Sequence, residues 1–380
     1  MARLVLNTSR RMPYAFAPAF SRGLGVPLAA ITSLIALNQA TSLLGPLSGP
    51  LGDRWGYRTM MLSGLGLLSI GTSAVGILPV YTTVALAVAL AGVAKILFDP
   101  AIQAYAGECV PYQNRGLAIG MIETSWAGST LLGIPLAGIL IGRAGWQSPF
   151  VALGVLALLS GLFIAWVIPA TPLRRHNGRW WAVYWDAWQS LRRWPAAWAL
   201  FSFTLLTCAA NDCIFVVYAS WLETGFALTV VALGGATIVI GVAELLAEGL
   251  VATVSDRIGL SRAAIAGTAL AVVSYAVLPL ASATLPLALS GLFLIFLSFE
   301  FSIVSAMSVF TEVMPNARGT MMSLNLSAAG AGRTLGALLG GIVWPMGGLL
   351  ASGLTAAAIC TLALSCLAWG LRRWHASQQS

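Results

Sequence analysis

The residues most capable of chemistry in this sequence are ionisable side chains inside long apolar runs. Lys95 is the only lysine; it lies in the apolar stretch 82–105, and Asp99 follows four residues later. On a helix this spacing places both groups on one face, where they can form an ion pair. Pro100 removes a backbone hydrogen bond and is expected to bend the helix there. The pair is either structural, because it neutralises itself, or functional, because a substrate or a proton competes for Asp99.

Other apolar runs carry charges as well. The acids are Asp99, Glu123, Asp212, Glu244, Glu248 and Glu300, and the bases are Arg10, Arg11, Lys95 and Arg333. Because acids outnumber bases, some carboxyl groups lack a basic partner, and such a group can hold a proton. Asp212 and Glu300 are the preferred proton or substrate sites. Glu244 and Glu248 lie one helical turn apart, which favours either a shared proton or polar packing between helices.

The composition explains why these charges are unusual. The chain is 58% hydrophobic and 8% charged, whereas about a quarter of the residues in a typical soluble domain are charged. The only histidines are His176 and His375, and the cysteines lack metal-ligand spacing. The sequence therefore predicts an all-α integral membrane protein without a cofactor or metal, and it disfavours an enzyme.

Twelve segments are long and apolar enough to cross a membrane, which takes about 20 residues each. They are 2–21, 27–50, 59–78, 82–105, 116–142, 147–168, 196–221, 227–254, 263–282, 285–310, 319–343 and 347–371. We predict two six-helix bundles, 1–168 and 196–380. The connection 169–195 is rich in tryptophan and is expected to form a cytoplasmic linker with an interfacial amphipathic helix.

The flanking arginines set the orientation. Fourteen, including Arg3, lie on the face that carries both termini and the long connection, whereas only Arg22 and Arg143 lie on the opposite face. Cytoplasmic loops are enriched in Lys and Arg, so the fourteen-arginine face is predicted to be cytoplasmic. This bias also accounts for the net charge of +8, and nucleic acid is not an expected partner.

The two halves of the chain repeat. The stretch GDRWGYR starts at Gly52 and SDRIGLSR starts at Ser255, an offset of 203 residues, and ECVPYQNRG (108–116) matches EVMPNARG (312–319) at 203 to 204. Duplicated six-helix halves are typical of transporters, whose substrate site lies between the halves near the middle of the bilayer.

These features resemble the major facilitator superfamily, and within it the bacterial drug and metabolite exporters. GPLGDRWGYR (49–58) is similar to the family's signature loop between helices 2 and 3, and DRIG (256–259) is similar to its weaker second copy. The resemblance implies a conformational switch in which Asp53 meets the start of helix 11 and Asp256 the start of helix 5. The switch residues are Gly49, Asp53, Arg54, Gly56, Arg58, Asp256, Arg257 and Gly259.

The resemblance also implies alternating access in a monomer of the bacterial inner membrane, with helices 1, 4, 7 and 10 lining the cavity. Helix 5 only partly matches the exporters' glycine–proline motif, since Ile134 separates Gly133 from Pro135. The predicted substrate or proton pathway comprises Arg11, Lys95, Asp99, Glu123, Asp212, Glu300 and Arg333. Arg10 and Arg11 are about 100° apart on the helix. Arg11 is preferred for the pathway, where it either binds an anionic group of the substrate or pairs with Asp212.

The leading functional hypothesis is a secondary active transporter that moves a small organic solute by alternating access, coupled to protons as an exporter. An alternative is an importer or symporter of an organic anion. A hypothesis from a different class is a membrane sensor that keeps the fold without transport. The expected partners are the solute and the lipid bilayer, and the energy source is a proton gradient, since the chain has no ATP-binding loop.

Overall fold

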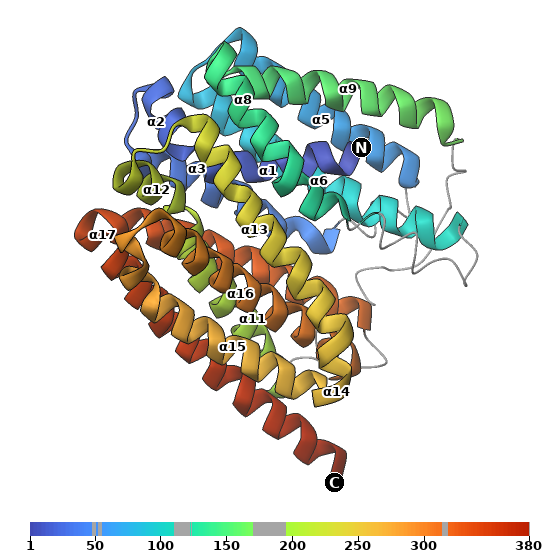
Figure 1. Ribbon diagram of the computed structural model, residues 1–380. Coiled ribbons are helices and arrows are strands. Elements are labelled where there is room, and N and C mark those ends of the chain that lie inside the picture. Colours follow the sequence, from blue (N-terminus) through green and yellow to red (C-terminus); the bar gives the residue numbers. More distant parts are fainter. Residues whose placement is uncertain are drawn as a thin grey trace. The chain divides into compact units, whose positions relative to one another are not determined.

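The computed structural model describes residues 1–47, 51, 55–109, 122, 124–169, 195–313 and 318–379, which are helical or lie in turns and short connections (Figure 1). The first half comprises α1 Ala2–Ala15, α2 Ala17–Leu24, α3 Leu28–Ala40, η1 Thr41–Leu47, α5 Tyr57–Ile77, α6 Tyr81–Cys109, η3 Ser129–Gly133, α8 Ile134–Ala144 and α9 Ser148–Val167. The second comprises α11 Pro195–Phe215, α12 Tyr218–Phe226, α13 Val230–Leu250, η4 Val251–Ser255, α14 Asp256–Ile258, α15 Leu260–Val277, η5 Leu278–Ala283, α16 Leu285–Val313 and α17 Arg318–Gln379.

Most of these helices have the length and composition of membrane spans. Among the described residues, ten helices are long and apolar enough to cross a membrane. The last of these, Leu324–Ala376, contains two helices that meet at Gly347 and Gly348, where the backbone is not helical. The first predicted span, formed by α1 and α2, is not among the ten. The prediction of an all-α integral membrane protein is confirmed, and the ten helices cover eleven of the twelve predicted spans.

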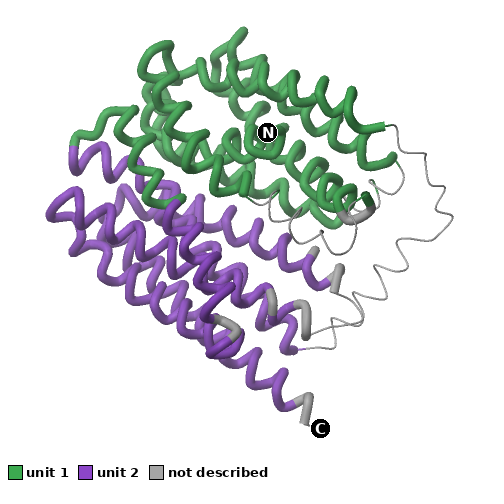
Figure 2. Tube along the Cα trace, turned by 45° about the vertical axis from the view of Figure 1, so that its right-hand side comes forward, with its two compact units in different colours: residues 1–177, 227–241 green, residues 178–226, 242–380 purple. Residues whose placement is uncertain are grey.

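The chain forms two compact units (Figure 2). Unit 1 comprises residues 1–177 and 227–241, and unit 2 comprises residues 178–226 and 242–380. Helix α13 therefore contributes its first part, Val230 to Gly241, to unit 1 and its remainder to unit 2. Within unit 1, this first part packs closely on α8: a Cβ atom built at Gly234 would lie 3.3 Å from the carbonyl oxygen of Ile134.

Prolines interrupt the helices of unit 1 at two places. Helix α1 ends at Ala15 and α2 begins at Ala17, because Pro18 lacks the N–H group that would bond to the carbonyl of Tyr14. The π-helix η3 ends at Gly133, two residues before Pro135, whose ring clashes with the carbonyl group four residues earlier. Pro100 is different, since it lies inside the single long helix α6.

In unit 2, a stripe of glycines lets α17 approach α11. A Cβ atom at Gly332, Gly336 or Gly340 would lie only 2.1 to 2.6 Å from the carbonyl oxygens of α11. Small residues at intervals of four are a common way for membrane helices to pack closely. This contact brings the inner faces of the two helices together, and it positions the charged residues described below.

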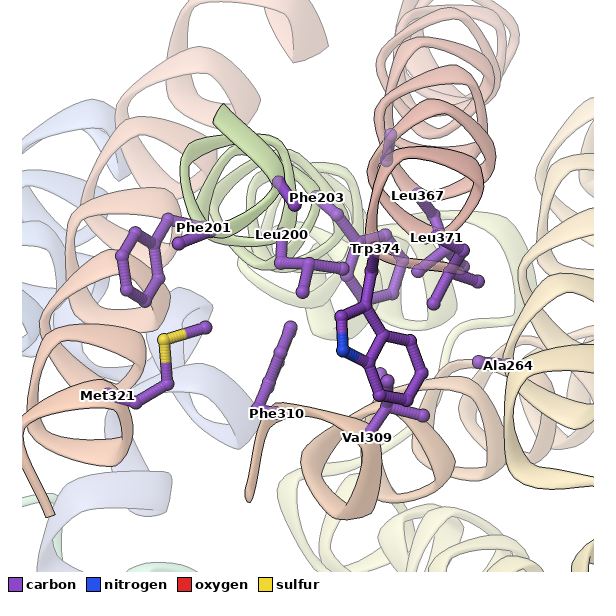
Figure 3. Close-up of a cluster of buried hydrophobic side chains, with 14 residues drawn as sticks. Leu200, Phe201, Phe203, Ala264, Val309, Phe310, Met321, Leu367, Leu371 and Trp374 are labelled. Carbon is purple, nitrogen blue, oxygen red and sulfur yellow. The ribbon is translucent and has the colours of Figure 1, made fainter. Parts of the chain in front are cut away.

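The helix ends of unit 2 are held by a buried apolar cluster (Figure 3). Phe203 on α11, Phe310 on α16 and Met321 at the start of α17 are all fully buried. Trp374, near the end of α17, is 6% exposed and belongs to the same cluster. The last helical turns of the chain are therefore part of the packed core of this unit.

Candidate functional site

The Lys95–Asp99 pair predicted from the spacing forms, and it is part of a larger cluster in unit 1. Lys95 Nζ lies 2.5 Å from Asp99 Oδ2, and Arg3 Nε on α1 lies 3.2 Å from Asp99 Oδ1. Lys95 also donates a hydrogen bond to Asn7 Oδ1 at 2.6 Å. The side chain of Asp99 is 17% exposed and those of both cations are 10% exposed. One carboxylate thus holds two cations from two helices.

A third helical segment joins this cluster. Arg3 Nη1 donates to the carbonyl oxygen of Ile122 at 2.9 Å, and Asn7 Nδ2 donates to Ser125 Oγ at 3.5 Å. Arg3 is one of the arginines predicted to flank the spans on the cytoplasmic face, and Asn7 is not among the predicted site residues. Because α1 begins at Ala2, both residues lie inside the helix and face their partners. The cluster therefore connects α1, α6 and the helical segment that precedes η3.

Arg11 occupies a second position on α1, one to two turns further along. It is 6% exposed, and its guanidinium carbon lies 3.9 Å from the centroid of the Trp126 ring. It also donates a hydrogen bond to the Thr130 hydroxyl on η3. Lys95 Nζ lies 5.4 Å from the same ring centroid. Trp126 is therefore the element that connects Arg11 to the Lys95–Asp99 cluster.

Arg10 faces a different set of partners. It donates to Asn38 Oδ1 at 3.1 Å, to the Gln39 side chain and to Ser42 Oγ at 3.1 Å. Two of these partners are fixed in turn, since Asn38 donates to the Val88 carbonyl oxygen and Gln39 donates to the Tyr14 hydroxyl. Arg10 and Arg11 thus point to different neighbours, as their angular separation on the helix requires.

Unit 2 contains its own buried ion pair. The Asp212 side chain on α11 has no exposed surface, and Arg333 Nη1 on α17 lies 3.1 Å from its Oδ2 atom. The guanidinium carbon of Arg333 lies 5.8 Å from the centroid of the Phe299 ring. Glu300, the neighbour of Phe299 on α16, is partly buried. Arg333 is therefore a basic partner of Asp212 within unit 2.

The contacts in the two units are related by the sequence repeat. An offset of 203 to 204 residues relates Thr8 to Asp212, Thr130 to Arg333 and Gly133 to Gly336. A Cβ atom at Gly133 would lie 2.1 Å from Thr8 Oγ1, and one at Gly336 would lie 2.9 Å from Asp212 Cβ. The same close helix contact occurs in both units, with a charged pair beside it in unit 2.

The signature loops are only partly described. Gly49, Asp53 and Arg54 lie outside the described residues, as does the side chain of Asp256. Gly56 and Gly259 occupy equivalent positions and adopt positive φ angles of 80° and 88°, a conformation that favours glycine. The switch function implied by the resemblance stays a prediction for these residues.

Two basic residues of these loops are described. Arg58 Nη2 donates to the carbonyl oxygen of Ala165 at 2.6 Å, in the last turn of α9. Carbonyl groups in the last turn of a helix lack a partner within the helix, so Arg58 stabilises the end of α9. Arg257 is exposed.

The remaining predicted carboxylates differ in their surroundings. Glu123 lies outside the described residues. Glu244 is 3% exposed, whereas Glu248, one turn later on α13, is exposed. The two therefore lie in different environments. Among the described residues, no three His, Cys, Asp or Glu side chains gather closely enough to hold a metal ion.

The aromatic residues that could line a substrate pathway are mostly packed. Tyr14, Phe16, Phe215 and Tyr218 are 0 to 6% exposed. Phe215 stacks on Tyr218 and meets Phe296 edge-on, at a centroid distance of 4.9 Å. Trp126, which is partly exposed, is not among the site residues predicted from the sequence. The number of residues between Arg11 and Trp126 could not predict their contact, because the two residues lie on different helices.

Comparisons with known proteins agree on one family. A family model described as Major Facilitator Superfamily matches residues 1–337. The uncharacterized MFS-type transporter YceJ of Bacillus subtilis (strain 168) is 29% identical over 318 residues, which cover 83% of this chain and 79% of that protein. The tetracenomycin C resistance and export protein of Streptomyces glaucescens is 29% identical over 153 residues, 39% of this chain and 28% of that protein.

A solved structure shows the same fold. The crystal structure of a bacterial homolog to the human lysosomal transporter Spinster, in an inward-facing and unoccupied conformation, superimposes with a TM-score of 0.76. The match covers 98% of this chain and 95% of that one, at 14% sequence identity.

Proposed function

Since the chain belongs to the major facilitator superfamily and is a secondary transporter rather than an enzyme, we propose that it exports a small organic solute in exchange for protons. The observation that carries the proposal is the position of Asp99. Its carboxylate holds Lys95 of α6 and Arg3 of α1 at 2.5 and 3.2 Å. Ionisable groups inside membrane helices usually have a transport function.

Protonation of Asp99 would change the contact between two helices. A proton on this carboxylate removes its charge and weakens both ion pairs together. The contact with Lys95 lies within α6, whereas the contact with Arg3 joins α6 to α1. Protonation would therefore loosen α1 from α6, and a proton that leaves would restore the contact. Asp212 and Glu300 in unit 2 are proposed as further proton or substrate sites.

Export is supported by two of the relatives that have descriptive names. One is the tetracenomycin C resistance and export protein, and another is the multidrug resistance protein fnx1 of Schizosaccharomyces pombe (strain 972 / ATCC 24843), which is 26% identical over 147 residues. Both match less than half of this chain, so they support a direction of transport and not a particular solute. Antiport with protons is proposed instead on the ion pairs of Asp99 with Lys95 and Arg3.

We further propose a bacterial cytoplasmic, or inner, membrane location with both termini in the cytoplasm. The support is the excess of arginine on the face that carries the termini and the linker 169–195. The protein is proposed to act as a monomer with 1–168 and 196–380 as its two moving bundles. Switch residues Gly49, Asp53, Arg54, Asp256 and Arg257 are proposed to hold the cytoplasmic side closed.

The test is a proton-flux assay with the full-length protein in lipid vesicles. A pH gradient is imposed, a trapped pH-sensitive dye reports proton movement, and solutes of different charge are added one at a time. At least one solute should accelerate the collapse of the gradient. Asp99→Asn should abolish this solute-dependent proton movement, whereas Glu223→Gln, which neutralises an acid on α12, should retain it.

Three outcomes would overturn the proposal. Solute movement that is independent of the pH gradient, and unchanged in Asp99→Asn, would indicate a uniporter. Movement of solute and proton in the same direction would indicate the symporter alternative. The absence of flux for every solute, in a protein that binds one of them, would favour the sensor.

A further inference from the structure

The aromatic face of Trp126 is already in contact with cations of the protein. The guanidinium carbon of Arg11 lies 3.9 Å from the ring centroid and Lys95 Nζ lies 5.4 Å from it. Aromatic faces are also the usual binding surface for lipophilic cations. A cationic solute at this ring would have to displace Arg11 while a second positive charge lies nearby. The arrangement in unit 1 therefore disfavours a cation.

The other aromatic faces near charged groups give the same result. In unit 2, Arg333 lies over the Phe299 ring. Tyr14 and Tyr218, which would suit a cation, are 2% and 1% exposed and belong to the packed interior. Among the described residues, the aromatic rings that lie next to buried charges are therefore already in contact with a cationic side chain of the protein.

The charges of the spans are also unequal between the two halves of the sequence. The first half carries Arg10, Arg11 and Lys95 against Asp99 and Glu123, and the second half carries Arg333 against Asp212, Glu244, Glu248 and Glu300. Asp99 is in addition shared with Arg3. The Thr130 hydroxyl accepts a hydrogen bond from Arg11 but carries no charge. The spans of the first half therefore carry a net positive charge, and those of the second half a net negative charge.

We infer that the solute carries a carboxylate that binds Arg11 over Trp126. This inference rests on the proposed function and specifies its substrate class. A guanidinium binds a carboxylate through two parallel hydrogen bonds, and stacking on an indole fixes the plane in which they form. A flat aromatic acid matches the chemistry of these two residues, because an aromatic ring can pack on an indole and a carboxylate can bind a guanidinium. Lys95 adds attraction at longer range.

The test uses naphthalene-2-carboxylate as the probe, with its neutral methyl ester and 2-naphthylmethylammonium as matched compounds. The purified full-length protein is heated with each compound, and the melting temperature is followed against concentration. A ligand that binds only the folded protein raises this temperature. The carboxylate should raise it, and the ester and the ammonium compound should not.

Variants assign the effect to Arg11. Arg11→Gln should weaken the carboxylate's apparent affinity by about tenfold or more, the loss expected for one charged contact. Arg10→Gln removes an arginine at the neighbouring position, which contacts Asn38, Gln39 and Ser42, and should leave the affinity within about twofold. Arg11→Lys keeps the charge but loses the planar fork, so it should fold and still bind more weakly.

Stabilisation by the ammonium compound alone, or equal effects of the Arg10 and Arg11 variants, would overturn the inference. If a cation then drives proton movement in vesicles, the proposed exporter stands and only the substrate class is wrong. If the carboxylate binds through Arg11 but moves no protons, the substrate class stands and the proton-coupled mechanism fails.

Discussion

Asp212 and Arg333 form an ion pair within the close contact between α11 and α17. Arg333 Nη1 lies 3.1 Å from Asp212 Oδ2, and the aspartate side chain has no exposed surface. One turn along α17, Gly336 leaves no room for a Cβ atom against Ala209 and Asp212. The ion pair depends on the glycine, because the absence of a side chain at Gly336 brings the helices close enough for the pair to form.

The first prediction concerns the charge of this pair. Arg333→Ala should lower the free energy of unfolding by about 3–5 kcal/mol, because it leaves a buried carboxylate without its partner. Thermal unfolding of the purified protein measures the loss. The double variant Asp212→Asn/Arg333→Gln removes both charges and should recover most of it. If the single variant melts at the wild-type temperature, this ion pair does not stabilise the unit.

The second prediction concerns the glycine contact. Gly336→Ala should destabilise the protein by about 1–3 kcal/mol, because the new methyl group would lie 2.4 Å from the Ala209 carbonyl oxygen. Gly66→Ala on α5 is the matched control, since nothing lies within 4 Å of its added Cβ. This control should stabilise by up to about 1 kcal/mol through helix propensity. Equal melting temperatures for the two variants would contradict the close packing of α11 and α17.

The all-α membrane fold was predictable because it depends on composition and on the length of apolar runs. The Lys95–Asp99 pair was predictable for a similar reason, since four residues on a helix fix its geometry. Arg3, Trp126 and Thr130 were not, because they meet α6 or α1 from segments far apart in sequence. Nor was the contact between Asp212 and Arg333, since α11 and α17 lie far apart in sequence. Charge counting identifies which groups need partners but not which helices are neighbours.

The third prediction concerns Arg58, which binds the end of α9 through the Ala165 carbonyl oxygen at 2.6 Å. Arg58→Gln should cost about 1 kcal/mol of unfolding free energy, the usual value of one hydrogen bond. The measurement is again thermal unfolding, with Arg257→Gln as a control because Arg257 is exposed. If Arg257→Gln lowers the free energy of unfolding more than Arg58→Gln does, the hydrogen bond between α5 and α9 contributes less to stability than the exposed arginine.

The last prediction concerns the C-terminal turns of α17. Trp374 is 6% exposed within the apolar cluster of unit 2, whereas Trp166 at the end of α9 is 83% exposed. Trp374→Ala should therefore destabilise the protein by about 3–5 kcal/mol, and Trp166→Ala should change the unfolding free energy by less than about 0.5 kcal/mol. The comparison separates burial from residue type, because the same side chain is removed in both. A similar loss in both variants would mean that Trp374 contributes no more than a surface tryptophan, and that the α17 end does not hold α11 and α16 in place.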